Sequence, residues 1–185
     1  MTARVQLSSS HPAPHFHLHN RSNTYAMIAT TLLLAAALAL PQTTTPQQHD
    51  SGVQQRGDKA MGFSHNVTNH HFTLLPDGGL ILAEANDPTD AKSREEILSH
   101  MNHIVGMFSA GNFDAPMFIH ARTPPEVPTM KRLRKSITYT AIPTPTGASV
   151  RVTSADPHAI AAIHDFLRFQ IADHKTGDPT TISAH

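Results

Sequence analysis

The sequence contains no cysteine and no tryptophan among its 185 residues, and aromatic residues make up only 5% of it. The absence of cysteine excludes a disulfide framework, a thiolate zinc site and catalysis by a cysteine nucleophile. Charged residues are also scarce, at 15%, and the formal net charge at pH 7 is +0. Because a protein that binds a phosphate backbone needs a positive surface, we expect no nucleic acid partner.

Histidine and methionine are plentiful instead, with 15 and 7 residues respectively. Their side chains bind soft or borderline metal ions without a thiolate. Enzyme signatures are missing: the sequence has no Gly-x-Ser-x-Gly elbow, no glycine-rich phosphate loop and no His-Glu-x-x-His motif. The composition therefore favours metal binding over catalysis, and acid–base catalysis by histidine with Glu96 or Asp165 is the third alternative.

Residues 1–40 are predicted to be a signal peptide or an N-terminal anchor. Positive charge from Arg4 and Arg21 precedes the apolar run AMIATTLLLAAALAL, and Ala37-Leu38-Ala39 forms a small-x-small cleavage signal. The run is short for a membrane span, which needs about twenty residues, so a cleaved peptide is favoured over an anchor and over a wrongly placed start codon. We therefore expect a periplasmic or secreted protein that meets a membrane only if this segment is kept.

One α+β domain is predicted over residues 61–178, after a disordered linker over residues 41–60 and before a tail over residues 179–185. Within it, residues 70–111 and residues 136–177 each show a β-hairpin followed by an amphipathic helix. A proline-rich connector over residues 112–135 separates the two units. Its segment PMFIH, residues 116–120, is interpreted as a short buried strand or loop.

The first unit has a tight turn at Asp77-Gly78-Gly79, which joins predicted strands over residues 71–75 and 80–84. A helix follows over residues 90–110, because apolar residues recur there at helical spacing. Gly111 ends this helix. The apolar stripe of the helix consists of Ile97, Met101, Ile104 and Phe108.

The second unit repeats this order, with strands over residues 136–142 and 148–153 and a helix opened by Asp156-Pro157. Asp87-Pro88 recurs in it as Asp156-Pro157, and Ile97 recurs at a similar offset as Ile163, which we interpret as an internal duplication with a small insertion or deletion. A two-layer α+β sandwich follows, in which a four-stranded antiparallel sheet from two ββα units carries two amphipathic helices on one face.

The first helix also carries a candidate metal site in the stretch EEILSHMNHIVGMF. At about 100° per residue, its side chains Glu96, His100, His103 and Met107 lie within roughly 60° of one another. Two imidazoles at this spacing can share one ion, and a thioether beside them favours copper, with zinc second. Further ligands must come from elsewhere in the chain, and the candidates are His120 and either His70 or His71, since neighbours on a strand face opposite sides.

Packing is the alternative function of these histidines. The offset that pairs Ile97 with Ile163 also pairs His100 with Phe166 and His103 with Phe169, so a flat ring is sufficient at both positions. Phe166 and Phe169 lie opposite the apolar stripe of the last helix and need to be covered by the connector, by a ligand or by a second subunit. The alternative to a metal-binding protein is therefore a non-catalytic interaction module that forms a homodimer through these two rings.

Several segments between residues 57 and 178 resemble a group of small exported bacterial proteins without an established function. These segments are GDKAMGF, NHHF, HMNHIVGMF, PMFIH, MKRL and AIHDFLRFQIADHKTGD. Members of this group are sometimes labelled aspartate carbamoyltransferase, an activity that needs a Ser-x-Arg-Thr turn and a His-Pro-x-Gln motif. Neither motif occurs here, so the resemblance implies an exported α+β domain and no reaction.

Overall fold

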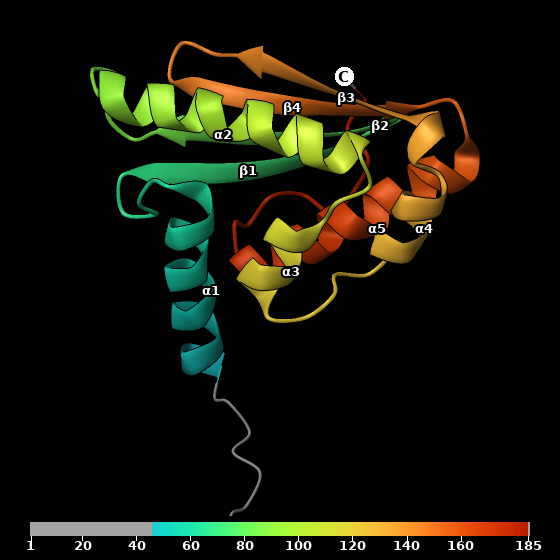
Figure 1. The fold of residues 1–185 in the computed structure, drawn as a ribbon, viewed down its shortest axis with the longest axis horizontal. Helices are drawn as coiled ribbons and strands as arrows, with labels where there is room; N and C mark the ends of the chain where they lie inside the picture. Colours follow the sequence, from blue (N-terminus) through green and yellow to red (C-terminus); the bar gives the residue numbers. More distant parts are fainter. Residues whose placement is uncertain (1–45, 185) are drawn as a thin grey trace, which may run out of the picture. The chain divides into compact units, whose positions relative to one another are not determined.

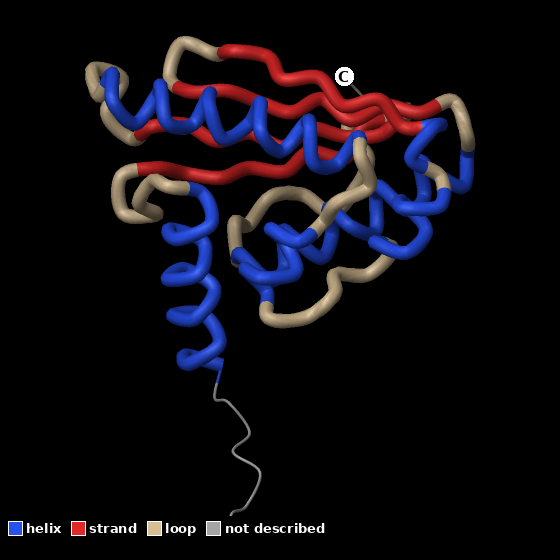
Figure 2. The backbone as a smooth tube through the Cα atoms, in the orientation of Figure 1, coloured by secondary structure: helices blue, strands red, loops and turns tan. Residues whose placement is uncertain are grey.

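Two β-hairpins combine into one antiparallel sheet in the computed structural model, which describes residues 46–184 (Figures 1 and 2). Strand β1 (Thr68–Leu75) pairs with β2 (Gly78–Ala85), and β3 (Ile137–Pro143) pairs with β4 (Gly147–Ser154). The two hairpins join through β2 and β4, which gives the four-stranded order β1-β2-β4-β3. The predicted export segment over residues 1–40 lies outside the described residues.

Close contact between the two hairpins depends on glycine at the start of β2 and of β4. Gly78 has a φ of 144°, and a Cβ atom there would lie 2.1 Å from the carbonyl oxygen of Val152. A Cβ atom on Gly147 would lie 2.2 Å from the carbonyl oxygen of Ala83. Any larger residue at either position would push β2 and β4 apart.

Two long helices pack on one face of the sheet, as the apolar stripes predict. Helix α2 (Ala91–Ser109) lies mainly on β3 and β4, and α5 (Pro157–His174) lies mainly on β1 and β2. Each begins at an aspartate cap, with Asp90 accepting from the Ser93 amide at 3.0 Å and Asp156 accepting from the His158 amide at 2.9 Å. The predicted α+β sandwich is thus confirmed, whereas the duplication of a ββα unit stays a prediction.

Helix α1 (Pro46–Met61) replaces most of the disordered linker that was predicted over residues 41–60. Its sequence is polar and contains two glycines, so its own helix propensity is low. Contacts with the rest of the domain hold it: Val53 is buried, and the Arg56 Nε atom donates to the carbonyl oxygen of Ile119 at 2.7 Å. The linker prediction is wrong here because tertiary packing outweighs local preference.

The connector also folds into helices, α3 (Asp114–His120), α4 (Val127–Arg132) and the 3-10 turn η1 (Arg134–Ser136). The interpretation of residues 116–120 as a strand or loop is therefore wrong. The prolines of the connector argued against helices, but Pro116 and Pro128 both lie in a first helical turn, where proline is tolerated.

The connector covers the second apolar side of α5. Phe166 is 2% exposed, and its ring centroid lies 6.1 Å from that of Phe113 and 6.2 Å from that of Phe108. Phe169 packs edge-on against His120, with centroids 4.9 Å apart, and under the Arg122 guanidinium at 4.7 Å. Both rings thus have partners within the chain. The apolar face that motivated the homodimer is covered, and the homodimer itself stays a prediction.

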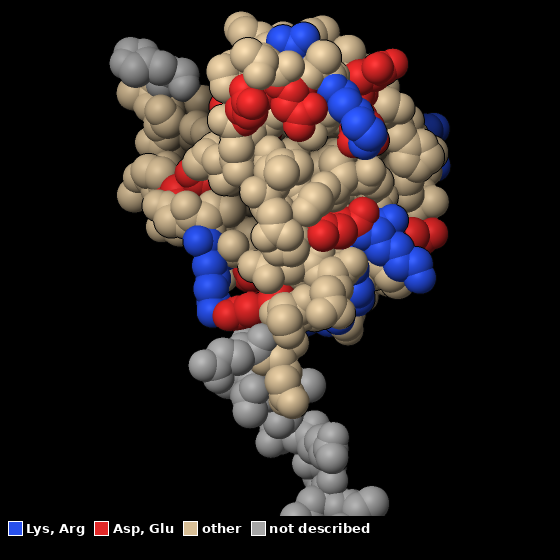
Figure 3. Space-filling view, turned by 90° about the vertical axis from the view of Figure 1, so that its left-hand side faces the viewer, with Lys and Arg blue, Asp and Glu red and all other residues tan. Residues whose placement is uncertain are grey.

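The surface agrees with the even balance of charges in the sequence. Figure 3 shows one face of the molecule, on which acidic and basic side chains lie close together and leave a wide uncharged area. Among residues 46–184, no helix is both long enough and apolar enough to cross a membrane.

Candidate functional site

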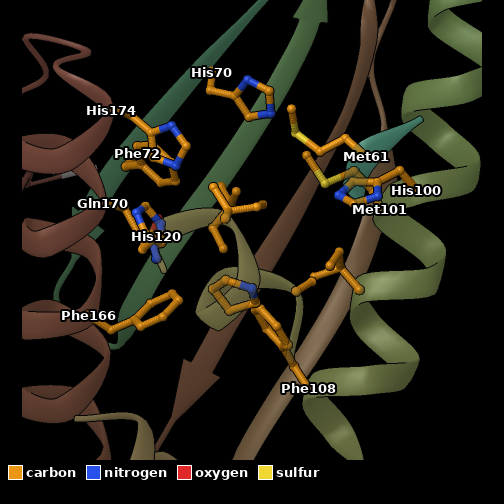
Figure 4. Close-up of a pocket in the computed structure, with 15 residues that line it drawn as sticks. Met61, His70, Phe72, His100, Met101, Phe108, His120, Phe166, Gln170 and His174 are labelled. Atoms are coloured by element: carbon orange, nitrogen blue, oxygen red, sulfur yellow. The ribbon is translucent and has the colours of Figure 1, made fainter. Parts of the chain in front are cut away.

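A cavity of about 70 Å³ lies between the sheet and the helices α2, α3 and α5 (Figure 4). Its walls are largely apolar, with Phe72, Phe108 and Phe166 among them. Nitrogen and sulfur donors interrupt these walls, and they come from four imidazoles and two thioethers, namely His70, His100, His120, His174, Met61 and Met101.

Strand alternation decides which histidine of the His70-His71 pair faces the cavity. His70 shares the inward face of β1 with the buried side chains of Phe72 and Leu74. His71 faces outward, where its Nδ1 atom lies 2.9 Å from an Asp178 oxygen. Of the two predicted alternatives, His70 is therefore the one that lines the same cavity as His100.

The rings of His70 and His100 lie around the ring of Phe63, which follows α1. Phe63 is nearly parallel to His70, with centroids 5.9 Å apart, and meets His100 edge-on at 5.6 Å. Met61 comes from the last turn of α1, and Met101 is the neighbour of His100 on α2. Figure 4 shows the two thioethers in the region between the two imidazoles, on the side of the cavity formed by α2.

His174 and His120 form the opposite side of the cavity. The His174 ring, on α5, is nearly parallel to that of His70, with centroids 6.2 Å apart. It also meets His120 edge-on at 4.9 Å. The row His100, Phe63, His70, His174, His120 thus runs from α2 past β1 and α5 to α3.

His120 is the anchored member of this row, because both of its nitrogens are engaged. It is 1% exposed, with Nδ1 2.5 Å from Asp173 Oδ2 and Nε2 2.8 Å from Gln170 Oε1. Asp173 also lies 2.9 Å from His49 Nε2 and accepts from Arg122 Nη2 at 2.5 Å. Burial raises the pKa of Asp173, but hydrogen bonds from His120 and His49 outweigh it and lower the pKa to about 2.

The other three imidazoles have free ring nitrogens. Within residues 46–184, no hydrogen bond reaches the rings of His70, His100 or His174. Burial lowers the pKa of His70 and of His100 to about 4 and that of His174 to about 3, and neighbouring imidazoles lower each further. All three are therefore neutral at pH 7 and keep a lone pair, which is the form of histidine that binds metal ions.

The predicted ligands divide into two groups. His100 and His120 line the cavity, as does His70. Glu96 instead pairs with Lys92, His103 is exposed, and Met107 packs half-buried against the hydrophobic core. The helix brings only one side chain of the predicted ridge to the cavity, because the ridge is broad and the cavity lies along its inner edge.

The sequence pattern does not single out three of the donors in the cavity wall. Met101 belongs to the predicted apolar stripe of its helix, Met61 lies next to the predicted linker, and His174 lies in the last turn of α5. A signal for His174 was present, because Phe166, Gln170 and His174 follow one another at intervals of four residues and so share a helix face.

The set of donors limits which ions fit. Among the described residues, no three or more His, Asp or Glu side chains are placed to hold one ion. A centre in this cavity therefore needs the methionine sulfurs as well as imidazoles. Comparison with family models, with curated proteins and with solved structures finds no match for this chain.

Proposed function

We propose that the protein binds a transition metal ion in this cavity, copper in preference to zinc. The ligands are His70 and His100 together with Met61 and Met101. One observation carries the proposal: two neutral imidazoles without a hydrogen-bond partner among the described residues lie beside two thioethers in a largely apolar cavity. A bound ion would use the ring lone pairs that the described residues leave without a hydrogen bond.

Copper suits this set of donors better than zinc does. Zinc sites in proteins use thiolate, imidazole and carboxylate ligands, almost always four of them in structural sites. This chain has no cysteine, and no carboxylate of the described residues lines the cavity. Thioether sulfur is a ligand that copper accepts.

His174 and His120 support the site rather than complete it. His120 is fixed by Asp173 and Gln170, and it holds the edge of His174. His174 in turn lies parallel to His70 and restricts the orientation of that ring. Such outer contacts orient ligands and typically change metal affinity by about 10- to 100-fold.

The rival function is an interaction module whose histidines only pack. Phe63 between His70 and His100 is the observation that favours it, since stacked and edge-on rings stabilise a core without any ion. The rival gives no role to three imidazoles whose nitrogens have no hydrogen bond to the described residues. Phe166, one of the two rings proposed for its interface, is 2% exposed and packs within the chain.

Stoichiometric metal titration of the mature protein, with a competing chelator, tests the proposal. We expect about one copper ion per chain. His100→Phe should abolish binding while it keeps a ring against Phe63, and His103→Phe on the exposed side of the same helix should leave binding intact. Circular dichroism of both variants reports whether they fold. Equal binding by wild type and a folded His100→Phe variant would refute the proposal.

A further inference from the structure

The charge around the candidate ligands is as informative as their identity. Thioethers and imidazoles bind metal ions as uncharged donors, so Met61, Met101, His70 and His100 bring no negative charge, and no Asp or Glu side chain among the described residues lines the cavity. Asp173, the acidic partner of the histidine row, already binds His120, His49 and Arg122. An ion in this cavity would therefore bring its whole charge into an apolar region.

The free energy needed to move an ion out of water rises with the square of its charge, so a divalent ion costs about four times as much as a monovalent ion of equal size. Divalent ions in proteins offset this cost with carboxylate or thiolate ligands or, for zinc, with three converging imidazoles. The described residues offer none of these sets at the cavity. A soft monovalent ion avoids most of the cost, because neutral sulfur and nitrogen donors bind it well.

We infer that the ion bound in this cavity is monovalent copper, and that Met61 and Met101 select it over divalent copper and zinc. This inference rests on the proposed metal site and narrows it to one oxidation state. Two imidazoles together with the two thioethers are sufficient for such an ion, because its single charge needs less compensation from its ligands. The lack of a third converging imidazole among the described residues, which argues against zinc, is therefore compatible with monovalent copper.

Met61 holds the outer position of the set. With His100 it lines both the cavity and a hollow at the surface, whose other walls include Glu95 and Glu96. Met101, by contrast, is 2% exposed and lies in the core stripe of α2. An incoming ion therefore reaches Met61 and His100 first, and His70 and Met101 complete its surroundings.

Methionine can be replaced by leucine at nearly constant volume, which removes the sulfur and leaves the packing largely intact. Met61→Leu, Met101→Leu and the double variant test the selection. Met107→Leu, on α2 but outside the cavity, and the buried Met130→Leu are matched controls. Silver(I) serves as a second probe, because it has the charge and softness of copper(I) and does not change oxidation state.

Anaerobic titrations with copper(I), silver(I), copper(II) and zinc(II), each against a suitable chelator, give the affinities. We expect wild type to bind both monovalent ions at least about 100-fold more tightly than zinc(II), and each cavity variant to lose at least about tenfold for the monovalent ions alone, with both controls unchanged. Zinc(II) or copper(II) bound as tightly as copper(I), or cavity variants that bind copper(I) like wild type, would overturn the inference while the metal site stands. If no ion binds at all, the proposed function itself fails.

Discussion

His120 Nδ1 lies 2.5 Å from Asp173 Oδ2, and both side chains are almost completely buried, at 1% and 6% exposure. This pair connects α3 to α5, and through His49 it also reaches α1. Because His120 supports His174, which lies against His70, the pair fixes one wall of the cavity.

The substitution Asp173→Asn is therefore expected to destabilise the whole domain. It would replace the carboxylate that His120, His49 and Arg122 share with a neutral amide, and loss of a hydrogen bond to a charged group costs about 1.5–3 kcal/mol. Urea unfolding measures the change. Asp165→Asn is the control, because Asp165 is exposed and pairs with Arg168 at 2.8 Å on the surface. Equal unfolding midpoints for the two variants would show that the buried pair contributes little.

Mild acid should weaken the protein through its neutral histidines. His70 and His100 have a pKa of about 4 in the folded chain and near 6.5 when unfolded, so the unfolded state binds more protons between these values. Stability is then complete above pH 6.5 and falls as the pH drops towards 4. One such histidine contributes on the order of 3 kcal/mol.

Unfolding midpoints in urea at pH 7.5, 6 and 5, without metal, measure this dependence. The decline should be smaller in His100→Phe, which cannot take up a proton, than in wild type. His158→Ala removes an exposed histidine at the start of α5 and should follow wild type. A midpoint that stays constant between pH 7.5 and pH 5 would contradict the burial of these imidazoles.

Phe166 and Phe169 should differ in what they contribute. Phe166 is core, so Phe166→Ala is expected to cost about 3–5 kcal/mol, whereas Phe169→Ala, which is only half-buried, should cost less. Chemical unfolding measures both changes. Light scattering on the same samples reports the oligomeric state. If wild type is a dimer and Phe166→Ala is a stable, folded monomer, the result would instead support the homodimer through this helix.

Export is tested by the N-terminus of the protein recovered from its host. The order of charged, apolar and small residues predicts that protein in the periplasm or medium begins after about Ala39. N-terminal sequencing or intact-mass measurement locates the first residue. Recovery of the full-length chain from the cytoplasm alone would contradict the prediction.

Local patterns were sufficient for the sheet and the two long helices. The Asp77-Gly78 turn and the stripe from Ile97 to Phe108 follow simple periodicity, and both elements form as predicted. Helix α1 was not predictable in this way, because its stability comes from contacts such as those of Val53 and Arg56 with distant residues. Sequence patterns report on residues that are close along the chain, and they carry no information about contacts between distant segments.

The same limit explains the outcome at the cavity. Helical spacing placed His100 and His103 on one ridge, but it could not show which of the two lines the cavity, because they differ only in which side of a broad ridge faces it. Met61 and His174 are both far from His100 along the chain, so only the fold brings them to it. Strand alternation predicts that only one of His70 and His71 can face the cavity. The structure shows that this one is His70, because the buried face of β1 is the face that carries it.

X-ray absorption spectroscopy at the copper edge of the protein loaded anaerobically with one equivalent of copper(I) tests the central claim most directly. The edge reports the oxidation state, and the fine structure reports which atoms surround the ion. We predict monovalent copper with both nitrogen and sulfur among its directly bound atoms, and loss of the sulfur signal in the Met61→Leu, Met101→Leu double variant but not in Met107→Leu. Copper bound by nitrogen and oxygen alone, in a protein whose only sulfur is methionine, would show that the thioethers of this cavity do not bind the ion.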